Sequence, residues 1–199
     1  MDKKTLTVLA LVVAGYLLMG KFATVNGNGV DVPTDGGAGP GLLDQATNIL
    51  TGLVGGMTYD DSGMQLTEQS ESLALTAYWD NAGQVWTIGW GHTGPDVYQG
   101  QVIDIGTAQD MLRADIAGAV ATVNRLVSAS LTQGQFDALV DFTFNVGSGA
   151  FASSTLLSDV NAGNFSDVGN QLSRWRYSNG SILAGLVTRR ANEAAAFYA

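Results

Sequence analysis

Two carboxylates and a threonine lie close together in residues 71–93, which read ESLALTAYWDNAGQVWTIGWGHT. Glu71 ends a predicted helix, Asp80 begins a predicted turn, and Thr87 follows the turn. A helix end and a hairpin can face each other across a groove, so we expect Glu71 and Asp80 on opposite walls. Glycoside hydrolysis needs this pair, because one carboxyl must donate a proton while the other stays ionised near the developing positive charge.

The surroundings of the two acids favour different roles. Apolar neighbours such as Leu73 and Leu75 are expected to keep Glu71 buried and protonated, whereas Asp80 in a polar turn is expected to stay ionised. Spacing alone is weak evidence, because acids at helix ends and turns more often cap the backbone or face solvent.

The surrounding pattern predicts the elements that position these residues. Residues 62–71 predict a short helix, and residues 75–80 and 84–90 predict a hairpin around Asn-Ala-Gly. Further helices are predicted at 107–127, opened by a Thr107–Asp110 capping box, and at 132–147, opened by a Thr132–Gln135 box. Shorter helices are expected near 154–161, 165–177 and 186–197. The predicted fold class is α+β: residues 58–199 form a catalytic domain with a small β-hairpin lobe and a larger helical lobe.

The N-terminal segment predicts a membrane anchor. Residues 5–20 carry no charge and lie between Lys4 and Lys21, so residues 1–22 are expected to form a single transmembrane helix that contacts the lipid. The paired lysines before it predict a cytoplasmic N-terminus and an external remainder. A cleaved signal peptide is the alternative, although no small-x-small site follows the apolar run.

Residues 23–57 are predicted to be a flexible linker with a short helix. The stretch 23–41 is rich in Gly and Pro and has no hydrophobic period, whereas residues 42–54 carry a modest helical stripe.

Composition excludes several classes of function. The chain has no cysteine and one histidine, which excludes thiol chemistry and makes a metal centre unlikely, so neither a metal nor another cofactor is expected. Its formal charge of −9 argues against binding of nucleic acid, which requires basic residues.

The segment also resembles the signature of glycoside hydrolase family 24, the phage-type lysozymes or endolysins. The resemblance continues through residues 131–157 and 174–193 and covers nearly all of residues 60–199. The residues that match the signature are Glu71, Leu73, Leu75, Tyr78, Asp80, Thr87, Ile88, Gly89, Gly91 and His92.

The resemblance implies a peptidoglycan N-acetylmuramidase that cleaves the β-1,4 bond between N-acetylmuramic acid and N-acetylglucosamine. It implies Glu71 as general acid, Asp80 as second carboxylate and Thr87 beside the attacking water. It also implies inversion at the anomeric carbon, with the carboxyl groups about 6.5–9.5 Å apart. Two departures qualify these roles: Ser72 stands where the family usually has Gly, and the spacing from Asp80 to Thr87 is one residue longer than usual.

Four further residues are candidates for supporting roles. His92 is expected to brace the hairpin, and Asn145 to satisfy backbone groups. Arg189 and Arg190 either pair with active-site acids or lie on a helix surface; the sequence leaves both open. The four tryptophans are expected to pack between the lobes more often than to stack on sugars.

The sequence leaves two rivals and two settings open. A lytic transglycosylase needs only one acid, and a catalytically silent wall-binding virion protein needs none. The monomeric catalytic domain would act either on the periplasmic side of the host inner membrane, during phage lysis, or from the membrane of a virion, during entry.

Overall fold

The computed structural model describes residues 24–26, 29–31, 56–178 and 180–199. Contacts divide the chain into Met1–Gly55 and Gly56–Ala199. In the first unit, strands β1 (Thr24–Asn26) and β2 (Gly29–Asp31) pair antiparallel. Both strands lie within residues 23–57, for which a flexible linker is predicted.

The predicted anchor at 1–22, with its lipid-contacting residues 5–20, and the predicted helix at 42–54 lie outside the described residues. Among the described residues, none of the helices has the length and hydropathy needed to cross a bilayer.

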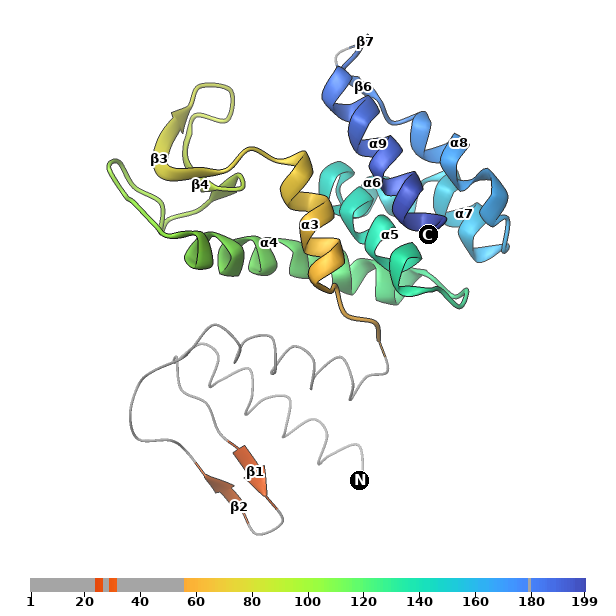
Figure 1. The fold of residues 1–199 in the computed structure, drawn as a ribbon, viewed down its shortest axis with the longest axis horizontal. Helices are drawn as coiled ribbons and strands as arrows, with labels where there is room; N and C mark the ends of the chain where they lie inside the picture. The colour runs from red at the N-terminus through yellow and green to blue at the C-terminus, as the bar shows by residue number, and fades with distance from the viewer. Residues whose placement is uncertain (1–23, 27–28, 32–55, 179) are drawn as a thin grey trace. The chain divides into compact units, whose positions relative to one another are not determined.

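The second unit begins with one helix and a small antiparallel sheet (Figure 1). The Asp60 carboxylate caps the first helix by accepting the backbone N–H groups of Ser62 and Gly63. The sheet order is β3-β4-β5, and Tyr78 pairs with Thr87. These elements are α3 (Asp61–Ser70), β3 (Ala74–Asp80), β4 (Val85–Gly89) and β5 (His92–Thr93).

The remaining elements form the helical lobe, with one short hairpin. In Figure 1 the long helix α4 runs from beneath the sheet to the other helices, and so joins the two lobes. The elements are α4 (Ile105–Leu126), α5 (Gln133–Val146), α6 (Ser148–Ala152), α7 (Thr155–Asn161), η1 (Phe165–Asp167), α8 (Val168–Ser173), β6 (Tyr177–Ser178), β7 (Ser181–Ile182) and α9 (Ala184–Phe197).

Most predicted elements are confirmed, including the hairpin and the Thr132–Gln135 capping box. The predicted start of α4 is wrong: Asp104 caps it by accepting the N–H of Thr107. The single predicted helix at 165–177 is also wrong. That stretch divides into η1 and α8, and then enters the β6–β7 hairpin, where Gly180 adopts a positive φ of 78°.

Two groups of buried side chains hold the lobes. The main core lies among the helices from α3 to α9 and contains Phe136, Phe142 and Phe151. The sheet buries a smaller cluster of Ala77, Ile88 and Val97, against which Met111 of α4 packs. One face of the sheet is therefore covered by α4, which fixes the direction of the opposite face.

Gly134 permits the close approach of α5 and α9. A Cβ added at this position would lie 2.5 Å from the carbonyl oxygen of Ala196. We expect Gly134→Ala to lower the free energy of unfolding by about 1–3 kcal/mol, because backbone must move. Gly118→Ala, in the open interior of α4, should raise it by up to about 1 kcal/mol. Urea unfolding measures both; equal effects would contradict the predicted contact.

Candidate active site

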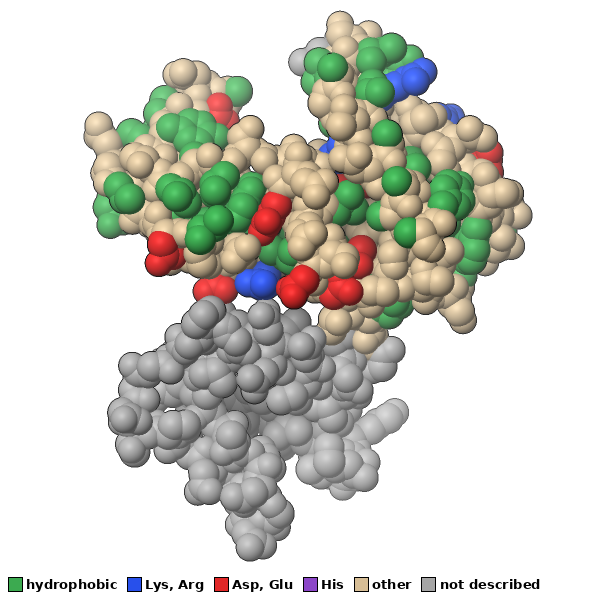
Figure 2. All heavy atoms as spheres, viewed as in Figure 1, with side chains coloured by type: hydrophobic (Ala, Val, Ile, Leu, Met, Phe, Trp, Pro, Cys, Tyr) green, Lys and Arg blue, Asp and Glu red, His purple; other side chains and the backbone are tan. Residues whose placement is uncertain are grey.

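Glu71 lies at the junction of the lobes, as the C-terminal cap of α3 and just before β3. Its side chain is 30% exposed. It borders a hollow of about 420 Å³ whose other lining residues are Gln65, Glu68, Gln69, Leu73 and Trp90. Figure 2 shows a notch between the sheet lobe and the β6–β7 end of the helical lobe.

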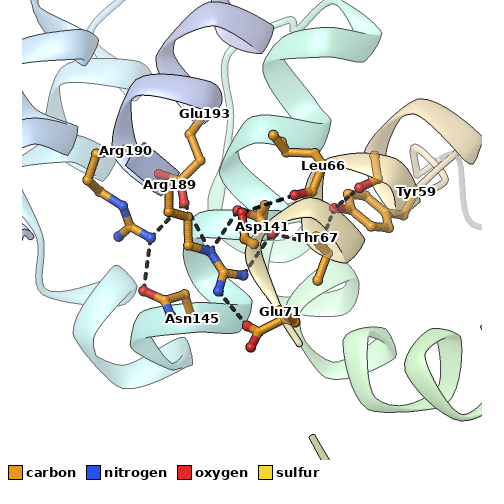
Figure 3. A network of polar contacts seen from close by, with 11 residues as sticks. Tyr59, Leu66, Thr67, Glu71, Asp141, Asn145, Arg189, Arg190 and Glu193 are labelled. Atoms are coloured by element: carbon orange, nitrogen blue, oxygen red, sulfur yellow. Dashed lines mark hydrogen bonds and ion pairs between the residues drawn. The ribbon is translucent and has the colours of Figure 1, made fainter. Parts of the chain in front are cut away.

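The predicted apolar surroundings of Glu71 are wrong. Leu73 and Leu75 are 39% and 38% exposed, so they do not bury the carboxyl group. Its partner is the guanidinium of Arg189, whose Nη1 donates to Oε1 (Figure 3). The carboxyl group is thus held by a charge from α9, which local sequence could not supply.

Arg189 is buried and pairs with two carboxylates. Its Nε and Nη2 donate to the two oxygens of Asp141 at 3.0 and 2.8 Å, while Nη1 donates to Glu71. Burial by itself lowers the pKa of Arg189, but the hydrogen bonds and charge of Asp141, followed by those of Glu71, raise it above its ordinary value. Of the two predicted alternatives for Arg189, a position on the helix surface is wrong, because the side chain is buried and pairs with Glu71 and Asp141.

A chain of buried polar groups continues behind Asp141. Thr67 of α3 donates to Asp141 Oδ1 at 2.7 Å, and the Tyr59 hydroxyl lies 2.7 Å from Thr67 Oγ1. Burial, and then the charge of Asp141, raises the pKa of Tyr59. Sequence reasoning missed these three residues. The available signal was an aspartate inside the apolar run of α5, a position that requires a buried cationic or hydrogen-bonding partner.

Arg190 forms a second buried group, so a helix-surface position is wrong for it as well. It is 2% exposed, and its Nη2 donates to Glu193 at 2.7 Å and to Asn145 at 2.8 Å. Asn145 therefore binds a side chain, where a backbone partner was predicted. Burial raises the pKa of Glu193 well above its ordinary range, against the opposing charge of Arg190.

Asp80 and Thr87 lie on the sheet face opposite α4. Directly paired residues share a face, as do alternate residues of one strand, so Tyr78, Thr87 and Asp80 point the same way. The Asp80 carboxylate accepts the backbone N–H groups of Ala82 and Gly83, which closes the turn. Thr87 Oγ1 is buried and has no hydrogen-bond partner among the described residues.

His92 joins the sheet to α4. Its Nδ1 lies 3.0 Å from the Asp115 carboxylate, and its Nε2 lies 3.1 Å from Asp96. Burial lowers its pKa, but the hydrogen bonds to Asp115 and Asp96 outweigh this and raise the pKa above 6.5. Among the described residues no three acidic or histidine side chains are arranged to bind a metal ion.

Comparison with known proteins gives the family of this chain. Residues 68–193 match the family model described as phage lysozyme. The chain is 44% identical to an endolysin of Bacillus phage PZA over 71% of its own length and 55% of that protein. It is 37% identical to a SAR-endolysin of Escherichia phage Mu, over 75% of this chain and 85% of that protein. The chain therefore belongs to the phage lysozyme family.

Solved structures agree with this assignment. The muramidase domain of SpmX from Asticaccaulis excentricus superposes with a TM-score of 0.66 at 36% identity, over 71% of this chain and 98% of that one. A P22 lysozyme mutant superposes with a TM-score of 0.67 at 30% identity, over 72% and 99%. The expected lysozyme-like fold, with a small antiparallel sheet and helices, is thus confirmed. This chain spans about half the length of the endolysins of Bacillus phages PZA and B103.

The charge of His92 is expected to stabilise the fold at low pH. Its folded-state pKa is raised, so this stabilisation is complete below about pH 6 and disappears as the pH rises through the raised value. We expect His92→Gln to lose about 1 kcal/mol of unfolding free energy at pH 5 and almost none at pH 9. Urea unfolding at both pH values tests this, and a loss independent of pH would contradict it.

Proposed function

We propose that this chain is a lysozyme that hydrolyses the β-1,4 bond between N-acetylmuramic acid and N-acetylglucosamine in bacterial peptidoglycan. The observation that carries the proposal is the position of Glu71, which borders a hollow at the junction of the lobes while buried Arg189 holds its carboxyl group. The endolysins and the muramidase domain to which the chain is similar support the same substrate class.

The proposed reaction uses three groups. Glu71 gives its proton to the leaving glycosidic oxygen as the bond to the anomeric carbon breaks. Ionised Asp80 stabilises the positive charge that develops on the sugar. A water molecule attacks the anomeric carbon from the side opposite the leaving oxygen. The resemblance to phage-type lysozymes assigns the orientation of this water to Thr87, whose hydroxyl has no hydrogen-bond partner among the described residues. The water supplies the hydroxyl of the new reducing end, and its second proton passes to Asp80.

The N-terminal segment supports a proposal about location. Similarity to SAR-endolysins, together with the uncharged run at 5–20, favours a membrane-anchored enzyme whose catalytic unit faces the periplasmic side of the host inner membrane. Action from the membrane of a virion is the second setting.

Replacement of the proton donor should abolish turnover. For Glu71→Gln in the full-length chain we expect kcat on peptidoglycan to fall at least about 100-fold, because the amide has no proton to donate. Glu68→Gln, one turn earlier on α3 and lining the same hollow, is expected to keep native activity within about twofold. A zymogram and turbidity assay compare them. Clearing by Glu71→Gln, or loss of clearing only in Glu68→Gln, would refute the assignment.

The products separate hydrolysis from the rival transglycosylase reaction. In H₂¹⁸O, the proposed enzyme places one ¹⁸O atom at each new reducing end, and NMR immediately after cleavage should show the inverted anomer. If mass spectrometry instead detects anhydro sugars that carry no ¹⁸O, the reaction is transglycosylation. Absence of any cleavage would favour the silent wall-binding alternative.

A further inference from the structure

At the proposed active site, the buried guanidinium of Arg189 donates hydrogen bonds to two carboxylates. Asp141 accepts from Arg189 Nε and Nη2, a two-point contact that fixes the plane of the guanidinium, and this leaves Nη1 directed at Glu71 (Figure 3). Asp141 is fully buried and Arg189 is 4% exposed, whereas Glu71 is 30% exposed. The orientation of the group that contacts Glu71 is therefore set from the interior, by Asp141.

Asp141 is itself held from the opposite side. Thr67 donates its hydroxyl hydrogen to Asp141 Oδ1. The Tyr59 hydroxyl donates its hydrogen to the carbonyl oxygen of Gly63 and lies 2.7 Å from Thr67 Oγ1. A row of polar contacts thus connects Tyr59, Thr67 and Asp141 to Arg189, which contacts the proposed proton donor.

The charges suggest why an acid is needed at this position. An arginine next to a carboxyl group favours the ionised form, which has no proton to donate. Asp141, on the same guanidinium, offsets that positive charge. Glu193 lies 3.7 Å from Arg189 Nε, and burial raises the pKa of its carboxyl group well above the ordinary range; its 2.7 Å contact is with Arg190.

Other ionisable groups face this cluster from each packed element. Arg190 lies on α9 beside Glu193, Asp137 lies on α5 one turn before Asp141, and Glu68 on α3 lines the hollow beside Glu71. None of these three has a hydrogen bond to Glu71 or Arg189 among the contacts of the described residues.

We propose that Asp141 is a positioning residue for the reaction: it orients Arg189 by two hydrogen bonds and offsets its charge, so that Glu71 can carry the proton it donates. This inference rests on the proposed role of Glu71. Asp141 touches no substrate atom and acts through Arg189.

The test is the pH dependence of kcat in the full-length Asp141→Asn variant, with soluble peptidoglycan fragments as substrate. Loss of the negative charge leaves Arg189 uncompensated beside Glu71. We expect the alkaline limb of the profile to move about one pH unit lower, which reduces kcat about tenfold at pH 8. The value of kcat at pH 5, and KM at both pH values, should change less than about threefold. A residue with only a structural role would reduce activity equally at all pH values, in proportion to the unfolded fraction.

Asp137→Asn is the matched control. Asp137 is also buried on α5, and burial raises its pKa to about 7, so its own ionisation falls within the range of the assay. Because it does not contact Arg189 or Glu71, neutralising it should leave the alkaline limb in place. Movement of the limb in Asp137→Asn, with none in Asp141→Asn, would overturn the proposal.

A charge-conserving variant covers the case in which Asp141→Asn does not fold. Asp141→Glu keeps the charge but displaces the two-point contact, so we expect kcat to fall at every pH while the alkaline limb stays in place. An unchanged kcat, or a limb displaced to lower pH, would overturn the proposal. Glu71→Gln separates the two hypotheses: if it remains active, the proposed function fails, and if it is inactive while the Asp141 variants behave like the native chain, only this inference fails.

Discussion

The guanidinium of Arg189 is buried away from water, so the folded domain has to supply its hydrogen-bond acceptors and compensating negative charge. A buried charge is tolerated only when opposite charges and hydrogen bonds compensate its lost hydration, and here the partners come from separate elements. Asp141 comes from the middle of α5, Glu71 from the end of α3, and Arg189 itself from α9. A single ion cluster therefore sets how these three elements meet, and it places the Glu71 carboxyl group at the surface of the hollow.

The sheet packs one of its faces on α4, and this sets its orientation. Ala77, Ile88 and their neighbours pack on α4, which directs the other face away from that helix. Asp80 and Thr87 lie on this second face, where one closes a turn and the other is a buried hydroxyl without a partner. The sheet is also linked to α4 through the contact of His92 with Asp115.

The interior of the helical lobe contains buried charged and polar side chains. Arg190, Glu193 and Asn145 form a hydrogen-bonded group next to the aromatic core, with the Arg190 guanidinium 4.8 Å above the Phe142 ring. This group is only partly paired, because Arg190 Nε and Nη1 and Glu193 Oε2 have no hydrogen-bond partner among the described residues.

The sequence by itself determined what depends on local pattern. Hydrophobic periodicity, turn residues and capping pairs located the hairpin and most helices, and the ordered motif from Glu71 to His92 indicated the family. Tertiary structure alone decided which charges meet. Arg189 follows Glu71 by 118 residues and Asp141 by 48, and Thr67 precedes Asp141 by 74. No local pattern encodes a pairing at such separations, because it arises only when three helices pack and exclude water. For the same reason the local sequence predicted apolar neighbours for Glu71, whereas the structure places the buried arginine Arg189 against it.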